Sequence, residues 1–200
     1  MKKFIREPLA FPIAVIFLFV PGTFNANARL GESAIQCSDR YGPAKTDQVT
    51  LMLEKMYPIL EGAIQRTFQY QGWKIRAAFL ELNGPAVRID YQKLLTAGTL
   101  PQVQDYELAA ILKGETGERL AWVQTSYDNP NSPNHGIAKA FEGVLLGGIG
   151  AKAWRRTDGA IAQLMPGGMI VRLELPEARQ YEEQLKVQKE QKARASVPQF

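Results

Sequence analysis

Four carboxylates, Glu81, Asp90, Asp158 and Glu174, are the side chains of this sequence best suited to acid–base chemistry. Two carboxyl groups that flank one glycosidic bond can act as acid and base in sugar hydrolysis. Each of the four stands beside a predicted turn or on the polar side of a predicted strand, where carboxylates are ordinary. Because nothing in the sequence makes two of them converge, a carboxylate-dependent hydrolase is the alternative function and not the favoured one.

Metal and nucleophile chemistry lack the residues that they need. His135 is the single histidine and Cys37 is the single cysteine, whereas a zinc site takes three or four ligands of these types. A serine triad would have to use His135, yet no G-x-S-x-G motif exists to present a serine. We therefore single out no catalytic residue and no metal site, and a non-enzymatic protein is favoured over an enzyme.

A glycine-rich match to the dinucleotide pattern G-x-G-x-x-[GA] begins at Gly148 and ends at Ala153. The pattern binds a pyrophosphate only where a strand precedes it and a helix starts on it. Here the chain reaches the predicted turn Asp158-Gly159 too soon for that helix. We therefore predict no cofactor.

The stretch 137–151 around this pattern is apolar, small and rich in glycine. Two interpretations remain open: a buried connection in which backbones approach closely, or a contact with a partner or a membrane surface. The polar loop 128–136 beside it would form the rim of such a surface. The residues that we single out as a candidate partner-binding set are Phe141, Leu145, Leu146, Ile149 and Trp154.

The first 28 residues predict a secretory signal peptide. Lys2, Lys3 and Arg6 precede an apolar run at 9–20, and Ala26-Asn27-Ala28 supplies the small residues of a cleavage site. An uncleaved N-terminal anchor is the alternative interpretation. Cleavage after Ala28 would leave an exported domain at 29–176 and a charged helical tail at 177–200, located in the periplasm or outside the cell.

Charge and cysteine content narrow the possible partners. The whole chain carries a formal net charge of +4, and without residues 1–28 it would carry about +2, which is too little to indicate nucleic-acid binding. A single cysteine permits no internal disulfide, so the core must hold the domain together. Cys37 either pairs between chains or is buried, and burial is favoured because free cysteine is usually buried.

The segment 71–92 shows the clearest structural pattern. Trp73, Ile75 and Phe79 alternate with more polar residues, which is the period of a strand with one dry face. Val87, Ile89 and Tyr91 resume the alternation after Asn83-Gly84, a pair that tolerates positive φ in a tight turn. We therefore predict an antiparallel hairpin that turns at Asn83-Gly84.

The remaining elements are predicted from periodicity and from glycine and proline. Helices are expected at 31–41, at 46–61 with an end at Pro58, at 101–113 with an end at Gly114, and at 177–195; strands are expected at 64–70, 120–127, 153–157, 160–165 and 169–175. Together they predict an α+β fold, an antiparallel sheet of hairpins and meanders packed on one face by short helices. Two units of helix plus meander remain an open alternative.

The run GESAIQCSDRYGPAK near the start of the expected domain resembles the short helix that opens certain exported bacterial modules. These modules include the β-lactamase-inhibitor-like fold and the small outer-membrane lipoprotein that assists barrel assembly. The opening ARLGES…C…RYG also resembles uncharacterised secreted bacterial proteins. The chain departs from the first two families because it has no lipobox and no cysteine pair. The resemblance implies an antiparallel sheet and a binding role.

These observations favour an exported, non-enzymatic binding module whose partner is a protein or another component of the cell envelope. The alternatives are the carboxylate-dependent hydrolase and a protein that associates with a membrane surface through residues 137–151. No nucleic acid is expected as a partner, and contact with the membrane through the signal peptide is expected only during export.

Overall fold

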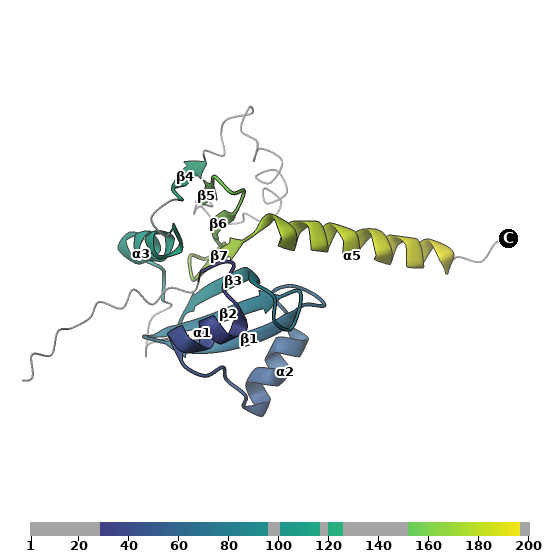
Figure 1. The fold of residues 1–200 in the computed structure, drawn as a ribbon, viewed down its shortest axis with the longest axis horizontal. Coiled ribbons are helices and arrows are strands. Elements are labelled where there is room, and N and C mark those ends of the chain that lie inside the picture. The colour runs from purple at the N-terminus through teal and green to yellow at the C-terminus, as the bar shows by residue number, and fades with distance from the viewer. Residues whose placement is uncertain (1–28, 96–100, 117–119, 126–151, 197–200) are drawn as a thin grey trace, which may run out of the picture.

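A computed structural model describes residues 29–95, 101–116, 120–125 and 152–196 (Figure 1). The predicted signal peptide, the polar loop 128–136 and the apolar stretch 137–151 lie outside these residues. So do four members of the candidate partner-binding set, namely Phe141, Leu145, Leu146 and Ile149.

The described helices are α1 (Ala34–Tyr41), α2 (Gln48–Met56), α3 (Asp105–Thr116) and α5 (Pro176–Ala195). The described strands are β1 (Ile64–Tyr70), β2 (Trp73–Phe79), β3 (Ala86–Lys93), β4 (Trp122–Thr125), β5 (Ala153–Arg156), β6 (Ile161–Leu164) and β7 (Ile170–Glu174). All seven strands form one sheet in the order β1-β2-β3-β7-β6-β5-β4, and every neighbouring pair is antiparallel. The predicted α+β class with an antiparallel sheet and a C-terminal helix is therefore confirmed.

The sheet consists of two meanders joined side by side. Strands β1, β2 and β3 form the first, strands β4 to β7 form the second, and the pairing of β3 with β7 joins them, with Tyr91 opposite Val171. This arrangement puts the middle of the sheet, at β3 and β7, in contact with neighbours on both sides. Several side chains on these two central strands are therefore fully buried, and Ile89, Val171 and Leu173 have no exposed surface.

The tight turn of the first meander lies one hairpin earlier than predicted. Gln71 and Gly72 join β1 to β2 with φ of 44° and 83°, the positive pair that a two-residue type I′ turn requires. Asn83 and Gly84 do not have positive φ. The prediction of a two-residue turn there was wrong, because the connection from Phe79 to Ala86 spans six residues and follows a register shift between Ala78 and Phe79.

One side of the sheet, which we call the α1/α3 face, carries the main core. Phe68, Ile75 and Phe79 point to this side, in agreement with the predicted dry face, and are at most 2% exposed. Helices α1 and α3 cover them (Figure 1), and Cys37 on α1 is fully buried in the same cluster. The prediction that Cys37 is buried is confirmed, and burial raises the pKa of its thiol to about 12.

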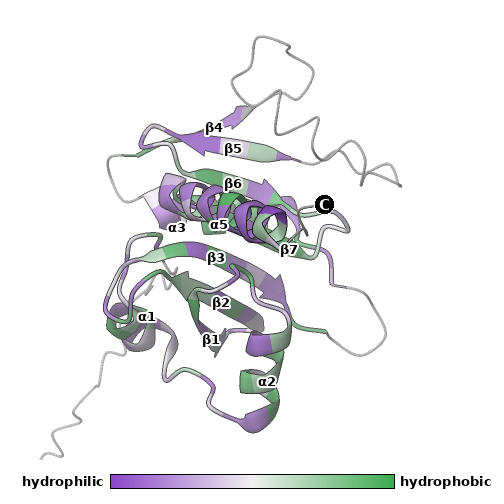
Figure 2. Ribbon diagram, turned by 90° about the vertical axis from the view of Figure 1, so that its right-hand side faces the viewer, coloured by the Kyte–Doolittle hydropathy of each residue, from purple (hydrophilic) through white to green (hydrophobic). Residues whose placement is uncertain are grey.

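Helices also cover the opposite side of the sheet, which we call the α2/α5 face (Figure 2). A small apolar cluster around Leu60, Ala78 and Ala178 anchors the first turns of α5 there. Charged and uncharged polar residues make up much of the rest. Arg88 on β3 donates to both carboxylate oxygens of Glu182 on α5, at 2.6 and 2.8 Å, so α5 is held by a buried guanidinium as well as by apolar contact.

The ends of two helices show how local sequence acts. Ser33 and Gln36 form a reciprocal capping box before α1, and Gly42 ends that helix with φ of 84°. Helix α3 starts at Asp105 and continues through Gly114 to Thr116. The predicted end at Gly114 was therefore wrong, because Glu115 extends the buried stripe that begins at Leu108 and gives the last turn a tertiary anchor.

Candidate functional site

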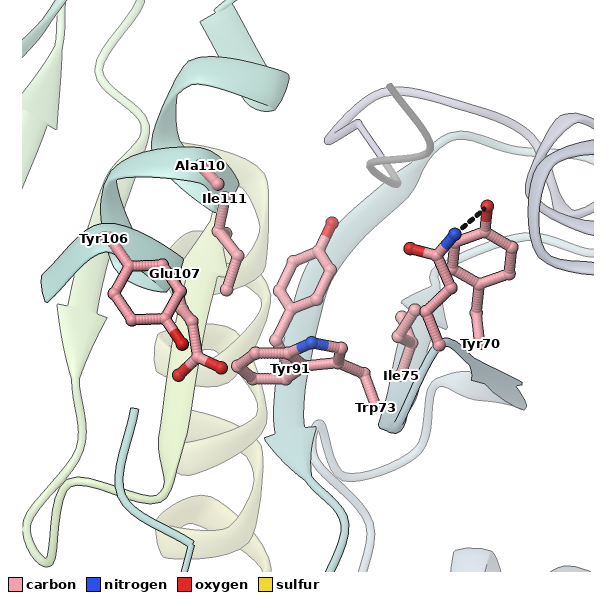
Figure 3. A pocket seen from close by; sticks show the side chains of 9 residues that line it. Tyr70, Trp73, Ile75, Tyr91, Tyr106, Glu107, Ala110 and Ile111 are labelled. Carbon is pink, nitrogen blue, oxygen red and sulfur yellow. Dashed lines mark hydrogen bonds between the residues drawn. The ribbon is translucent and has the colours of Figure 1, made fainter. Parts of the chain in front are cut away.

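An aromatic pocket on the α1/α3 face is the best-formed concave site that we find in the described residues. It encloses about 200 Å³ between one end of the β1–β2 hairpin and helix α3 (Figure 3). Its lining residues are Tyr70, Gln71, Trp73, Ile75, Tyr91, Tyr106, Glu107, Ala110 and Ile111. Four aromatic rings in one small pocket indicate a site for an apolar or ring-shaped group.

Strand register positions the floor and one wall. Ile75 and Tyr91 are cross-strand partners, and both are at most 3% exposed. Trp73 lies two residues before Ile75 and so on the same side of β2, while the type I′ turn brings Tyr70 opposite Trp73. The tight turn therefore forms one end of the pocket, because it holds these two half-buried rings next to each other.

Helix α3 supplies the facing wall. Tyr106 and Ala110 are one helical turn apart, as are Glu107 and Ile111, so these two pairs lie side by side on the helix. Ile111 is buried, whereas Tyr106 is 73% exposed and forms the rim. Figure 3 shows Tyr106 and Glu107 across from the strand residues. A binding group would thus enter between a helix and a sheet.

Polar groups are few and lie at the edge of the pocket. Glu107 pairs with Lys93 at 2.7 Å and also accepts a hydrogen bond from the backbone N–H of Gln104 at 2.8 Å. Gln71 donates its side-chain amide to the Tyr70 hydroxyl at 3.0 Å. Since the carboxylate is already paired with an ammonium group, the rim offers hydrogen bonds without a net charge.

Behind the floor, the hydroxyl of Tyr91 belongs to a buried polar network. It donates to Glu115 Oε1 at 2.9 Å and lies 3.3 Å from the Tyr41 hydroxyl. The other oxygen of Glu115 accepts the backbone N–H of Leu30 at 2.9 Å. One carboxyl group thus links the pocket floor, helix α3 and the N-terminal segment.

Glu115 is the described carboxyl group whose pKa is raised most clearly. Burial raises its pKa from 4.5 to about 7, although the hydrogen bonds from Leu30 and Tyr91 and the charge of Arg156 act in the opposite direction. The carboxyl group does not line the pocket, because Tyr91 stands between them. Its direct effect is therefore on the position of the pocket floor.

The four carboxylates considered for hydrolysis do not form an acid–base pair. Asp90 is fully buried between Arg76 and Arg172, and Glu174 pairs with Arg88. Both are on the α2/α5 face, away from the pocket. The remaining two are also separate, since Asp158 pairs with Arg156 in the β5–β6 turn and Glu81 is exposed in the loop before β3.

Trp154, the one described member of the candidate partner-binding set, does not join the pocket. It lies on β5, half-buried against the main core, while Trp73 lies on β2. Three strands separate β2 from β5 in the sheet, which is a distance of roughly 19 Å at the usual strand spacing. The aromatic pocket and any site around Trp154 are therefore different places.

Sequence reasoning missed the pocket as a set, although it placed some members. The alternation over 71–92 put Trp73, Ile75 and Tyr91 on one side of the sheet. The pocket residues on α3 could be placed only from the packing of that helix against the sheet. One signal was available for Glu115, since it follows Leu108, Ile111 and Leu112 at the spacing of a buried helical stripe.

In the parts of the chain that the structure describes, no helix combines the length and apolar character that a membrane crossing needs. The same residues contain no group of three or more histidine, cysteine or acidic side chains placed to hold a metal ion.

Comparison with known proteins gives no relative: no protein-family model, no curated protein and no solved structure matches this chain. The class is therefore defined by the structure itself. The chain is an α+β protein with a continuous antiparallel sheet, an aromatic pocket on one face and a charged network on the other.

Proposed function

We propose that this protein is an exported, non-enzymatic binding module that holds a protein or another cell-envelope component through the aromatic pocket. The observation that supports it best is the pocket: four aromatic side chains from β1, β2, β3 and α3 surround about 200 Å³ next to a neutral polar rim. Export itself rests on the sequence of residues 1–28.

The size of the pocket favours an anchor point for a larger partner. Sites that enclose a drug-sized molecule span roughly 300–1,000 Å³, so about 200 Å³ suits one side chain or one ring. Binding energy between macromolecules concentrates in such pockets, where a few buried anchors do most of the work. The partner is then a chain or polymer that inserts one apolar or aromatic group.

Two aromatic side chains of the pocket also keep part of their surface exposed to solvent. Trp73 is half-buried and Tyr106 is 73% exposed, and among the described residues neither ring stacks on another. Covering them would remove apolar area from water, which is favourable at roughly 25 cal/mol per Å². Their hydroxyl and indole N–H groups remain able to form hydrogen bonds at the rim.

Capture from the cell envelope with two matched variants tests the proposal. Tyr106→Ala removes the exposed wall of the pocket, and Leu82→Ala removes an apolar side chain that is 63% exposed in the loop before β3. We expect wild type and Leu82→Ala to retain the same partner and Tyr106→Ala to lose most of it. Urea denaturation of all three proteins checks that stability stays equal.

Direct titration identifies the group that enters. We expect NMR shifts of Trp73 and Ile111 with p-cresol, which represents a tyrosine side chain, and a much smaller response in Tyr106→Ala. A response to methyl glucoside alone would indicate a sugar ring. If neither probe shifts these residues and the captured proteins do not depend on Tyr106, the pocket is not the binding site.

A further inference from the structure

The α2/α5 face carries a second set of binding groups, independent of the aromatic pocket. Lys74 and Arg76 on β2 and Arg172 on β7 lie on the same side of the sheet, since Arg76 is opposite Asp90 and Asp90 is opposite Arg172. Asp90 is fully buried and is shared by both arginines, at 3.3 Å from Arg76 and 2.8 Å from Arg172. Two guanidinium groups thus share one carboxylate.

Positive charge exceeds negative charge on this strip. Glu54 on α2 is the other acidic group that acts on Lys74 and Arg76, and it forms no ion pair with either within the described residues. Lys74 also has no ion pair there. Burial is the first cause that lowers the pKa values of Lys74 and Arg76. The charge of Arg76 lowers the pKa of Lys74 further, whereas Asp90 raises the pKa of Arg76 and outranks the opposing charge of Arg172.

The surroundings favour a polypeptide over a free anion. Side-chain amides of Gln69, Gln92 and Gln163 flank the cations on the same side of the sheet, and amides can both donate to and accept from a peptide backbone. Helix α2 adds an apolar stripe, because Val49, Met52 and Met56 are each more than half exposed. Exposed methionine is typical of surfaces that receive varied apolar side chains.

A flat membrane surface fits less well. The side chains of Arg76 and Arg172 are only 18% and 24% exposed, so their guanidinium groups are set back from the outer surface. Figure 2 shows α2 and α5 on this side of the sheet. A bilayer would meet these helices before it reached the guanidinium groups.

We propose that the strip formed by Lys74, Arg76 and Arg172, together with the exposed stripe of α2, binds an acidic peptide segment of a partner protein. Carboxylates of the segment would pair with Lys74 and the arginines, and its apolar side chains would contact Met52 and Met56. Because this surface is on the face opposite the pocket, its test does not depend on the proposed function.

Fluorescence anisotropy with two labelled probes tests the proposal: an oligoglutamate, and the same peptide interrupted by leucines. We expect both to bind at low salt, the second more tightly, with affinity falling as salt rises. Lys74→Gln should weaken binding about fivefold, the effect of one partly exposed ion pair. Lys113→Gln removes an exposed lysine of α3 on the other face and should have no effect.

Other results would contradict the proposal or change it. Equal affinities of Lys74→Gln, Lys113→Gln and wild type would overturn the proposal, as would an absence of binding to both peptides at low salt. Binding to vesicles of anionic lipid that Lys74→Gln abolishes, without binding to the peptides, would replace the peptide with a membrane surface. Met52→Ser should remove the advantage of the leucine-containing probe, and unchanged discrimination would exclude α2 from the surface.

Discussion

The two faces of the sheet differ in the interactions that join the strands to the helices that cover them. On the α1/α3 face, large apolar side chains such as Phe68 pack under two helices, and Glu115 is a fully buried carboxyl group with no ion-pair partner in the described residues. On the α2/α5 face, arginines and carboxylates pair directly on the strands, with Arg88 and Asp90 buried. The same strands thus present a hydrophobic core on one side and an ionic network on the other.

This difference indicates separate tasks for the two faces. Apolar packing is non-directional, and on this face a ring-lined pocket lies between α3 and the strands. Ion pairs are directional, and a buried one contributes little net stability while fixing the geometry of its neighbours. We therefore expect most of the stability to come from the α1/α3 face, and the position of α5 to depend on the α2/α5 face.

The largest effect should follow from a cavity in the apolar core. Phe68→Ala removes a ring with no exposed surface and should lower the free energy of unfolding by about 3–5 kcal/mol. Urea denaturation measures it. Ile35→Ala, at a side chain that is 70% exposed, is the control and should change little. A loss below that of Arg88→Met would contradict the assignment of most stability to this face.

The next effect should come from the ionic face. Arg88→Met leaves the buried Glu174 without its closest cation and releases Glu182 of α5, at a cost of about 3 kcal/mol. Protease cleavage within α5 should become faster. Arg194→Met, on the exposed end of the same helix, is the control. In Arg88→Met/Glu174→Leu most of the loss should be recovered, and an additive further loss would show that the pair is stabilising in itself.

Glu115 should give the apolar face a pH dependence. Its pKa is about 7 in the folded protein and 4.5 in the reference state, so between these values the folded protein binds more protons. The free energy of unfolding should therefore fall as pH rises from about 4.5 to 7, by about 2–3 kcal/mol from this group. Glu115→Gln should flatten the profile, while Glu81→Gln, an exposed carboxylate, should keep it. Parallel profiles for all three proteins would exclude Glu115 as the source.

The smallest effect concerns the turn that the two faces share. Gln71 has φ of 44°, which costs a non-glycine residue energy, so Gln71→Gly should stabilise the protein by about 0.5 kcal/mol after the entropy of glycine is counted. Gly72→Ala should destabilise the protein by about 1 kcal/mol, because φ there is 83°, which strains a residue that has a Cβ. The added Cβ itself meets open space, so the effect comes from the backbone alone. Thermal denaturation of both variants measures the difference, and equal signs would contradict the type I′ assignment.

The extent of prediction from sequence can be seen at particular residues. Alternation placed Trp73, Ile75 and Phe79 on the core side, because side chains of a strand point alternately to its two faces. The same reasoning failed for the turns. Asn83-Gly84 has the composition of a tight turn, yet positive φ occurs at Gln71, a residue that seldom adopts it. A local preference of this kind yields when strand register requires another position.

The candidate site was harder to predict from the sequence than the turns were. Tyr91 and Tyr106 are fifteen positions apart, and one is on a strand and the other on a helix, so no periodic pattern connects them. Glu115 followed a glycine that usually ends helices, and its burial arises from the contacts of its carboxyl group with Tyr91 and Leu30. These are long-range contacts that local propensity does not encode.

By itself, the sequence determined the class of the fold, most strand positions, the end of α1 at Tyr41 and the burial of Cys37, because these depend on the period and size of neighbouring side chains. The tertiary structure alone decided that two meanders join at β3 and β7, that α3 faces the β1–β2 hairpin, and that Asp90 lies between two arginines. The physical reason is that a pocket and an ion-pair network are made by residues distant in the chain, whose proximity exists only after the sheet has closed around its core.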